Sequence, residues 1–194
     1  MSIHIPQNIQ MSILDDVQNG LDLTMNIPLS SNTVKLLTDN WTLYYHLPQD
    51  SNWNLQSYKI IMSKINTVDS IIALNENIPE NIVKFCMLFI IRDGITPMWE
   101  DPKNRDGGCF SYKVTNKTVY QIWKTLLYKM CGGTLCTNNK YNSAINGITI
   151  SPKKNFCIIK IWLNTCDYQD PTIISPIKDL SNEGCLFKKH KPEF

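Results

Sequence analysis

The chain has 194 residues, of which 43% are hydrophobic and 19% are charged, and its formal net charge is +2. This length suits one domain with one sizeable core, and the composition excludes general disorder. Because so small a net charge excludes a general binder of nucleic acid, any contact with RNA must come from a local site. The longest apolar runs, such as Phe85–Ile91, are too short to cross a membrane, and the N-terminus lacks the pattern of a signal peptide. We therefore expect a cytoplasmic protein with no membrane partner.

The seven cysteines form no C-x-x-C pair, and only His4, His46 and His190 could join them in a metal site. The odd number and irregular spacing favour neither a disulfide framework nor a zinc site. We expect reduced, mostly buried thiols, and neither a metal nor a cofactor. The abundance of isoleucine, asparagine and lysine suggests an A+T-rich genome, such as that of a protist or a large DNA virus.

Residues 1–33 are polar with scattered single apolar residues, so they predict an N-terminal arm, and residues 34–194 predict the folded domain. Two segments near the start of that domain predict strands. Trp41–Leu47 is rich in aromatic residues of high strand propensity, and Tyr58–Lys64 alternates in the same way.

Two helices are predicted from apolar residues that recur at helical spacing. The first covers Val68–Ile78, with Thr67 as a suitable N-cap and Pro79 as the residue that ends or kinks it. The second, Thr118–Cys131, is the most clearly amphipathic segment of the chain, and Gly132-Gly133 closes it.

Further strands are predicted on both sides of the second helix. They cover Phe85–Ile91, Cys109–Val114, Gly147–Ser151, Cys157–Leu163 and a short segment near Cys185–Lys188. A loop rich in glycine and proline, Arg92–Gly108, follows the first of these strands, and the basic turn Pro152–Asn155 joins the third and fourth. Strands joined by hairpin-length loops and mixed with two or three helices predict an α+β fold with a largely antiparallel sheet.

Two of the five tryptophans lie where a core residue is not expected. Trp41 falls in an alternating strand and Trp123 on a helix face, so both are interpreted as structural. Trp53 and Trp99 lie in polar, turn-rich segments, and Glu100 follows Trp99 directly. A single loop tryptophan is often structural, but two of them beside an acid are typical of a platform on which a flat ligand stacks.

The segment Asp93–Asp101 reads D-G-I-T-P-M-W-E-D, and Asn104 and Gly107-Gly108 follow it. This string resembles the signature of the eukaryotic translation initiation factor 4E family. Further matches occur in the same order at Trp53, Ser63-Lys64, Thr67-Val68, Lys124–Leu127 and Ile161-Trp162. The resemblance extends over about two-thirds of the chain, and it implies a curved sheet with helices on the convex face and a binding slot on the concave face.

The family binds the 7-methylguanosine cap of messenger RNA, and the resemblance assigns a role to each matching residue. Trp53 and Trp99 would sandwich the base, Glu100 would accept hydrogen bonds from its edge, and Trp162 would lie beside the methyl group. The backbone of Met98 would lie near the base. A methylated guanine is cationic, so indole faces attract it, and a carboxylate can accept from both N–H groups of its edge.

The phosphate-binding positions depart from the family. Its principal arginine aligns with Lys153, which keeps the charge but loses the bidentate geometry. A second arginine aligns with Cys109, a lysine with Ile158, and a supporting acid with Met87. We expect Lys153, with Lys154 or Arg105, to attract the phosphates, although two lysines in a turn are also typical of a solvated surface. The basic residues Lys188–Lys191 are interpreted either as a solvated tail or as contacts to nucleotides after the cap.

The convex face departs as well. The family docks the Y-x-x-x-x-L-Φ helix of the scaffold factor 4G against a tryptophan that aligns with Ile72, and its glutamate aligns with Lys124. Val68 and Leu127 stay apolar. Either this surface has drifted, or it binds a dedicated helical partner, which is the interpretation that we favour.

The resemblance thus predicts a cap-binding initiation factor that contacts capped mRNA and a scaffold protein. The altered convex face leaves open a cap-binding repressor or decoy that lacks a productive scaffold contact. No phosphate-cradling glycine loop, metal cluster or Cys–His motif supports catalysis, so an enzyme is not expected.

Overall fold

The computed structural model describes residues 34–47 and 50–191. The predicted N-terminal arm, residues 1–33, lies outside the described residues. Of the helices that are described, none is long and apolar enough to span a membrane.

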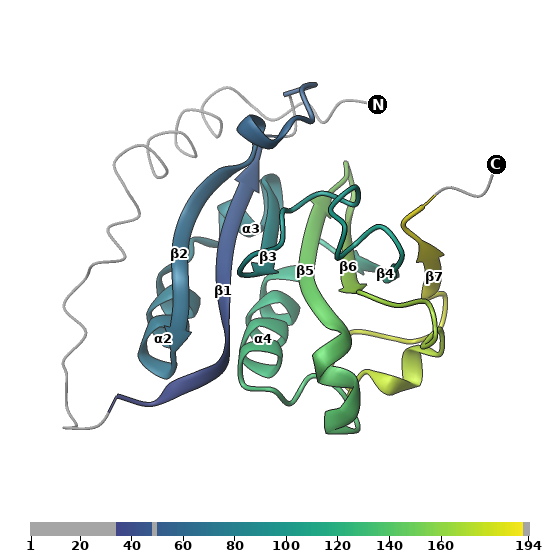
Figure 1. Cartoon of the computed structure of the whole chain (residues 1–194). Coiled ribbons are helices and arrows are strands. Elements are labelled where there is room, and N and C mark those ends of the chain that lie inside the picture. Colours follow the sequence, from purple (N-terminus) through teal and green to yellow (C-terminus); the bar gives the residue numbers. More distant parts are fainter. Residues whose placement is uncertain (1–33, 48–49, 192–194) are drawn as a thin grey trace.

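The fold is built on a seven-stranded sheet with the order β2-β1-β3-β5-β6-β4-β7, in which every pair of neighbours is antiparallel (Figure 1). The strands are β1 (Leu36–His46), β2 (Lys59–Thr67), β3 (Met87–Arg92), β4 (Gly108–Thr115), β5 (Ile145–Pro152), β6 (Phe156–Leu163) and β7 (Leu186–Lys189). The predicted α+β fold with a curved, antiparallel sheet is confirmed.

Three α-helices cover one face of the sheet and lie behind it in Figure 1. They are α2 (Val68–Asn77), α3 (Glu80–Phe85) and α4 (Val119–Cys131), and three 3-10 turns, η1 (Leu55–Ser57), η2 (Asn139–Ala144) and η3 (Pro171–Ile173), lie in the connections. Between sheet and helices lies one large core, which contains the fully buried Trp41 and Trp123. The structural role predicted for these two tryptophans is confirmed.

Helix α2 begins where its capping residues predict. The Thr67 Oγ1 accepts a hydrogen bond from the Ser70 N–H at 3.0 Å, and the Ser70 Oγ accepts one from the Thr67 N–H at 3.1 Å. These reciprocal bonds satisfy two backbone donors that a helix N-terminus otherwise leaves without a partner.

The strand predicted over Phe85–Ile91 begins two residues later, at Met87, because a helix precedes it. Helix α3 follows Pro79, and its last turn closes through the Cys86 N–H, which donates to the Ile82 oxygen at 2.9 Å. A proline is compatible with a helix N-terminus, so Pro79 ends one helix and starts the next. The apolar residues of the predicted strand thus divide between a helix end and a strand.

Candidate functional site

A cavity of about 280 Å³ opens on the sheet face opposite the helices. Successive strand residues point to opposite faces, so one set of each strand enters the core and the other faces this cavity. Its lining consists of Trp53, Tyr58, Met87, Phe89, Pro97, Met98, Trp99, Glu100, Thr149, Ser151, Lys160 and Trp162. Five predicted site residues therefore meet in one place: Trp53, Met98, Trp99, Glu100 and Trp162.

Lys153 and Lys154, which were predicted to attract the phosphates, do not line this cavity. They lie exposed in the turn between β5 and β6, where the Lys153 N–H donates to the Phe156 oxygen at 2.7 Å. The predicted phosphate lysines therefore lie outside the lining of the cavity, with Lys153 two residues beyond the lining residue Ser151.

Trp53 is held by a histidine behind its ring. The rings of His46 and Trp53 are stacked with centroids 4.1 Å apart and planes 2° apart, and Tyr58 contacts Trp53 edge-on at 6.3 Å. His46 is fully buried, and its Nε2 lies 2.9 Å from the Asn52 oxygen, which makes Nε2 the donor. Trp53 is still 48% exposed, so the ring has one supported face and one open face.

Trp99 and Glu100 are presented by a loop that is cross-linked through its own side chains. The Asp101 Oδ2 accepts from the Thr96 N–H at 2.7 Å and from the Thr96 hydroxyl at 2.8 Å, and its Oδ1 accepts from the Lys103 N–H at 2.9 Å. Burial raises the pKa of Asp101, but these hydrogen bonds outweigh it and lower that pKa below its usual value. Trp99 is 40% exposed at the tip of this loop.

The buried Asn104 ties the loop to the sheet. Its Nδ2 donates to the Thr96 oxygen at 3.2 Å and to the Met98 oxygen at 2.8 Å, while its Oδ1 accepts from Asn146 Nδ2 at 2.9 Å. Most of the loop signature is therefore scaffolding that fixes the positions of Trp99 and Glu100.

Trp162 forms the floor of the cavity and is itself buried. Its Nε1 donates to the Thr149 hydroxyl at 3.3 Å, and the ring of His190 packs against it with centroids 4.6 Å apart. His190 Nδ1 lies 2.7 Å from the Asn104 oxygen. Of the basic residues Lys188–Lys191, Lys188 and Lys189 therefore belong to β7, and His190 packs inward rather than into solvent.

Tyr58 and Lys160 line the cavity although sequence reasoning did not select them. Burial, and then the charge of Glu100, raise the pKa of Tyr58 to about 12, so its hydroxyl stays protonated at neutral pH beside the carboxylate. Lys160 stands two residues before Trp162 on β6, and strand alternation therefore places both on the cavity face. That alternation was the signal that could have identified Lys160.

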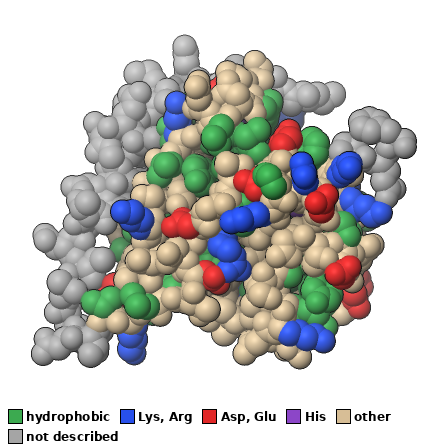
Figure 2. Space-filling view, viewed as in Figure 1, with side chains coloured by type: hydrophobic (Ala, Val, Ile, Leu, Met, Phe, Trp, Pro, Cys, Tyr) green, Lys and Arg blue, Asp and Glu red, His purple; other side chains and the backbone are tan. Residues whose placement is uncertain are grey.

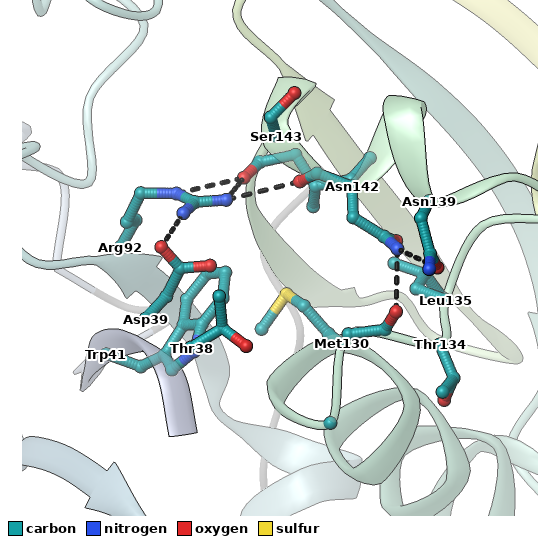
Figure 3. A pocket seen from close by; sticks show the side chains of 13 residues that line it. Thr38, Asp39, Trp41, Arg92, Met130, Thr134, Leu135, Asn139, Asn142 and Ser143 are labelled. Atoms are coloured by element: carbon teal, nitrogen blue, oxygen red, sulfur yellow. Dashed lines mark hydrogen bonds and ion pairs between the residues drawn. The ribbon is translucent and has the colours of Figure 1, made fainter. Parts of the chain in front are cut away.

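A larger cavity, of about 550 Å³, lies between the start of β1 and the end of α4 (Figure 3). Its one guanidinium, that of Arg92, forms an ion pair with Asp39 and donates to the Ile145 oxygen at 2.7 Å and the Asn142 oxygen at 3.2 Å. Because these partners satisfy Arg92, the guanidinium clamps η2 to the sheet and is not presented to a ligand.

On the helix-covered face, the four predicted partner-binding residues differ in accessibility. Ile72 is 44% exposed and Val68 is half-buried, whereas Leu127 is fully buried and cannot contact a partner directly. The Lys124 Nζ lies 3.2 Å from a Glu76 carboxylate oxygen, and the Tyr128 hydroxyl donates to the same carboxylate at 2.9 Å. The prediction for Leu127 is therefore corrected, because helix periodicity turns this residue toward the core.

The cysteines of the described residues are all reduced thiols, five of them buried. Within the same residues, no group of three or more His, Cys, Asp or Glu side chains is arranged to hold a metal ion.

Comparison with known proteins gives one consistent result. A family model described as Eukaryotic initiation factor 4E matches residues 36–191. Eukaryotic translation initiation factor 4E of Candida glabrata is 27% identical over 158 residues, which cover 79% of this chain and 70% of that protein. The human factor is 25% identical over 140 residues, covering 69% of this chain and 63% of that protein. An initiation factor 4E homolog of Acanthamoeba polyphaga mimivirus is 42% identical over 62 residues, which cover 32% of this chain and only 23% of that protein.

Solved structures share the fold. The complex of C. elegans eIF4E-3 with the 4E-binding protein Mextli and a cap analog aligns with a TM-score of 0.60 at 24% identity, covering 69% of this chain and 76% of that one. Schistosome eIF4E complexed with m7GpppG and 4E-BP aligns with a TM-score of 0.61 at 21% identity, covering 69% and 74% of the two chains.

Proposed function

The chain belongs to the eukaryotic initiation factor 4E family, and on that premise we propose that it binds the 7-methylguanosine cap of mRNA between Trp53 and Trp99. The observation that carries the proposal is that the open face of Trp53, the exposed Trp99 and the carboxylate of Glu100 all border one cavity. Residues 34–194 are proposed as the cap-binding domain, supported by the family match.

Stacking supplies the affinity for a methylated base. Methylation at N7 gives the guanine a positive charge, which adds cation–π attraction to stacking, and each aromatic partner contributes roughly 1–3 kcal/mol. His46 supports this arrangement because it fills the inner face of Trp53 and leaves the outer face for the base. With Trp53 held in place, less entropy is lost when the ligand binds.

Glu100 supplies the discrimination of guanine from other bases. A carboxylate accepts from both N–H groups of the guanine edge, and it binds them more strongly because methylation makes them better donors. Since Tyr58 keeps its proton, it adds no second negative charge to the cavity. Trp162 is proposed to lie beside the methyl group and the Met98 backbone near the base, as both border the cavity.

Tryptophan fluorescence tests this proposal directly. Wild-type protein, Trp99→Ala and Trp123→Phe are titrated with 7-methylguanosine triphosphate and with GTP. Trp123 is buried away from the cavity, so Trp123→Phe is the matched control for removing one indole. We expect quenching that selects the methylated nucleotide in wild type and control, and that disappears in Trp99→Ala. Equal quenching by both nucleotides in wild type would reject the proposal.

A role in translation initiation requires a second contact, on the helix-covered face. We propose that Ile72, Val68 and Lys124 dock an amphipathic helix that carries an acidic residue, since Lys124 offers a positive charge beside exposed apolar surface. The partner would be a scaffold protein or a dedicated helical protein. Initiation takes place in the cytoplasm, so this is the proposed location, in the host if the chain is viral.

The competing function is a cap-binding repressor or decoy, and the ion pair between Lys124 and Glu76 favours it because a partner helix would have to compete with Glu76 for the lysine. Two synthetic Y-x-x-x-x-L-Φ helices, one with glutamate and one with lysine at its variable positions, separate these functions. An initiation role predicts that wild type prefers the acidic helix and that Lys124→Glu reverses the preference. Binding of neither helix would favour the repressor or decoy.

A further inference from the structure

The phosphates of a capped message need cations close to the base site, and Lys160 is the one cation among the described residues that line the cavity. Lys160 lies two residues from Trp162 along β6, roughly 7 Å at about 3.3 Å per residue. Lys160 itself lines the cavity, whereas Lys153 stands two residues beyond the lining residue Ser151 and does not line it. A ligand in the cavity therefore meets Lys160 before either turn lysine.

A second lysine reaches the same area from the neighbouring strands. In the sheet, Cys109 of β4 pairs with Trp162 on one side and with Lys188 of β7 on the other. Residues opposite each other across antiparallel strands point to the same face, so Lys188 shares the face of Trp162 and Lys160. Burial raises the pKa of the Cys109 thiol, and the positive charges of Lys160 and Lys188 each lower it.

Both ammonium groups are available to a ligand. Several other cations of the described part of the chain have partners: Lys84, Arg92 and Lys124 form ion pairs with carboxylates, and Lys113 lies over the ring of Phe156. Over residues 34–47 and 50–191, the side chains of Lys160 and Lys188 form no ion pair or hydrogen bond. Figure 2 shows Lys and Arg side chains gathered over β4 and β7 on this face, with acidic side chains among them.

We infer that Lys160 and Lys188 bind the triphosphate of the cap, between the cavity that contains Trp53 and Trp99 and the edge strand β7. The inference rests on the proposed cap binding and adds its phosphate site. Lys160 and Lys188 flank Cys109, an uncharged residue where the family signature has an arginine, and Lys160 stands on the same strand face as Ile158, which aligns with a family lysine. Lys160 and Lys188 thus restore the positive charge that Cys109 and Ile158 lack by comparison with the family.

The test compares ligands that differ only in phosphates. Wild type, Lys160→Met, Lys188→Met and the control pair Lys153→Met and Lys154→Met are titrated with 7-methylguanosine and with its triphosphate. We expect Lys160→Met and Lys188→Met each to weaken triphosphate binding roughly tenfold and to change nucleoside binding far less. The slope of log affinity against log salt should fall by about one per lysine removed, and Lys160→Arg should restore most of the affinity.

The outcomes separate this inference from the proposed function. Equal losses for nucleoside and triphosphate would mean that the lysines support the fold, and would overturn the inference. Losses confined to Lys153→Met and Lys154→Met would also overturn it. If wild type failed to distinguish 7-methylguanosine from guanosine, the cap proposal would fail, while lysine-dependent binding of GTP would still establish the phosphate site.

Discussion

At the scale of single residues, the side chains around the cavity divide into those that face it and those that hold the facing ones. Trp53, Trp99 and Glu100 face it, whereas Asp101 and Asn104 make hydrogen bonds inside the loop. The holding residues are the more constrained, because buried polar groups cost free energy unless each donor and acceptor has a partner.

Replacing Asn104 with alanine tests the holding role. The change removes the side-chain donor of the Thr96 and Met98 oxygens and one of the two acceptors of the Asn146 amide, so we expect a loss of about 2–3 kcal/mol in the free energy of unfolding. It should also weaken cap-analog binding, because Trp99 loses its fixed position. Urea unfolding and ligand titration measure the two effects. The exposed turn residue Asn155 provides the control Asn155→Ala, for which both values should stay near wild type.

His190 makes stability depend on pH. Burial, together with the charge of Lys160, lowers its pKa below the ordinary 6.5, although the Asn104 carbonyl raises it. The unfolded chain therefore binds a proton at His190 more readily than the folded chain does. The contribution of His190 to the free energy of unfolding is complete above pH 6.5 and is lost as the pH falls through the folded-state pKa. Urea unfolding between pH 8 and pH 5.5 should show a smaller loss for His190→Gln than for wild type. The same loss in both proteins would assign the effect to other groups.

At the scale of elements, the two longer helices start in different ways. Thr67 caps α2 through its side chain, whereas Thr118 stands at the N-cap of α4 with no such bond to the helix. Helix α4 is instead held by its buried face, which includes Trp123 and Leu126. Local hydrogen bonds thus matter more for α2, whose exposed side carries Ile72.

The comparison of Thr67→Ala with Thr118→Ala tests this difference. Loss of an N-cap side chain costs about 1 kcal/mol, so Thr67→Ala should lower the free energy of unfolding by that amount. Thr118→Ala should cost clearly less, since its hydroxyl contacts only Thr115. Thermal unfolding followed by circular dichroism measures both, and equal losses would contradict the capping argument.

At the scale of the whole molecule, the cysteines report on the integrity of the core. Burial raises the pKa of Cys86 and Cys131 to about 12, and that of Cys136 and Cys157 to about 11. A thiol reacts as its thiolate, so these four are protected from reagents both by their protons and by the surrounding side chains.

Thiol labelling should therefore follow global unfolding. In the native protein at pH 8, we expect fast reaction only at Cys166 and Cys185, the two cysteines that are partly accessible. The buried five should react at the rate of unfolding, and urea should accelerate them together. The variant Cys166→Ser/Cys185→Ser is the control and should show almost no fast phase. Fast labelling of more than two thiols would mean that the core opens locally.

Most strands, the two longer helices and the loop tryptophans could be predicted from the sequence, because strand alternation, helical spacing and capping are local properties of the chain. The strand predicted over Trp41–Leu47 begins earlier, at Leu36, and helix α3 was not predicted, since an apolar run as short as Phe85–Ile91 fits a strand and a helix end equally well. The segment Asp93–Asp101 also indicated Trp99 and Glu100, because the hydrogen bonds that shape this loop join residues close together in the sequence.

Which of these residues share a site depends on contacts between segments that are distant in the sequence. Sheet register places Lys188 across Cys109 from Trp162, and no local pattern encodes that pairing of strands distant in sequence. The stacking of Trp53 on the ring of His46, with centroids 4.1 Å apart, is likewise a contact that no periodicity indicated. Periodicity tells which side of an element a residue faces, whereas neighbours across the sheet depend on how the whole chain pairs and buries its core.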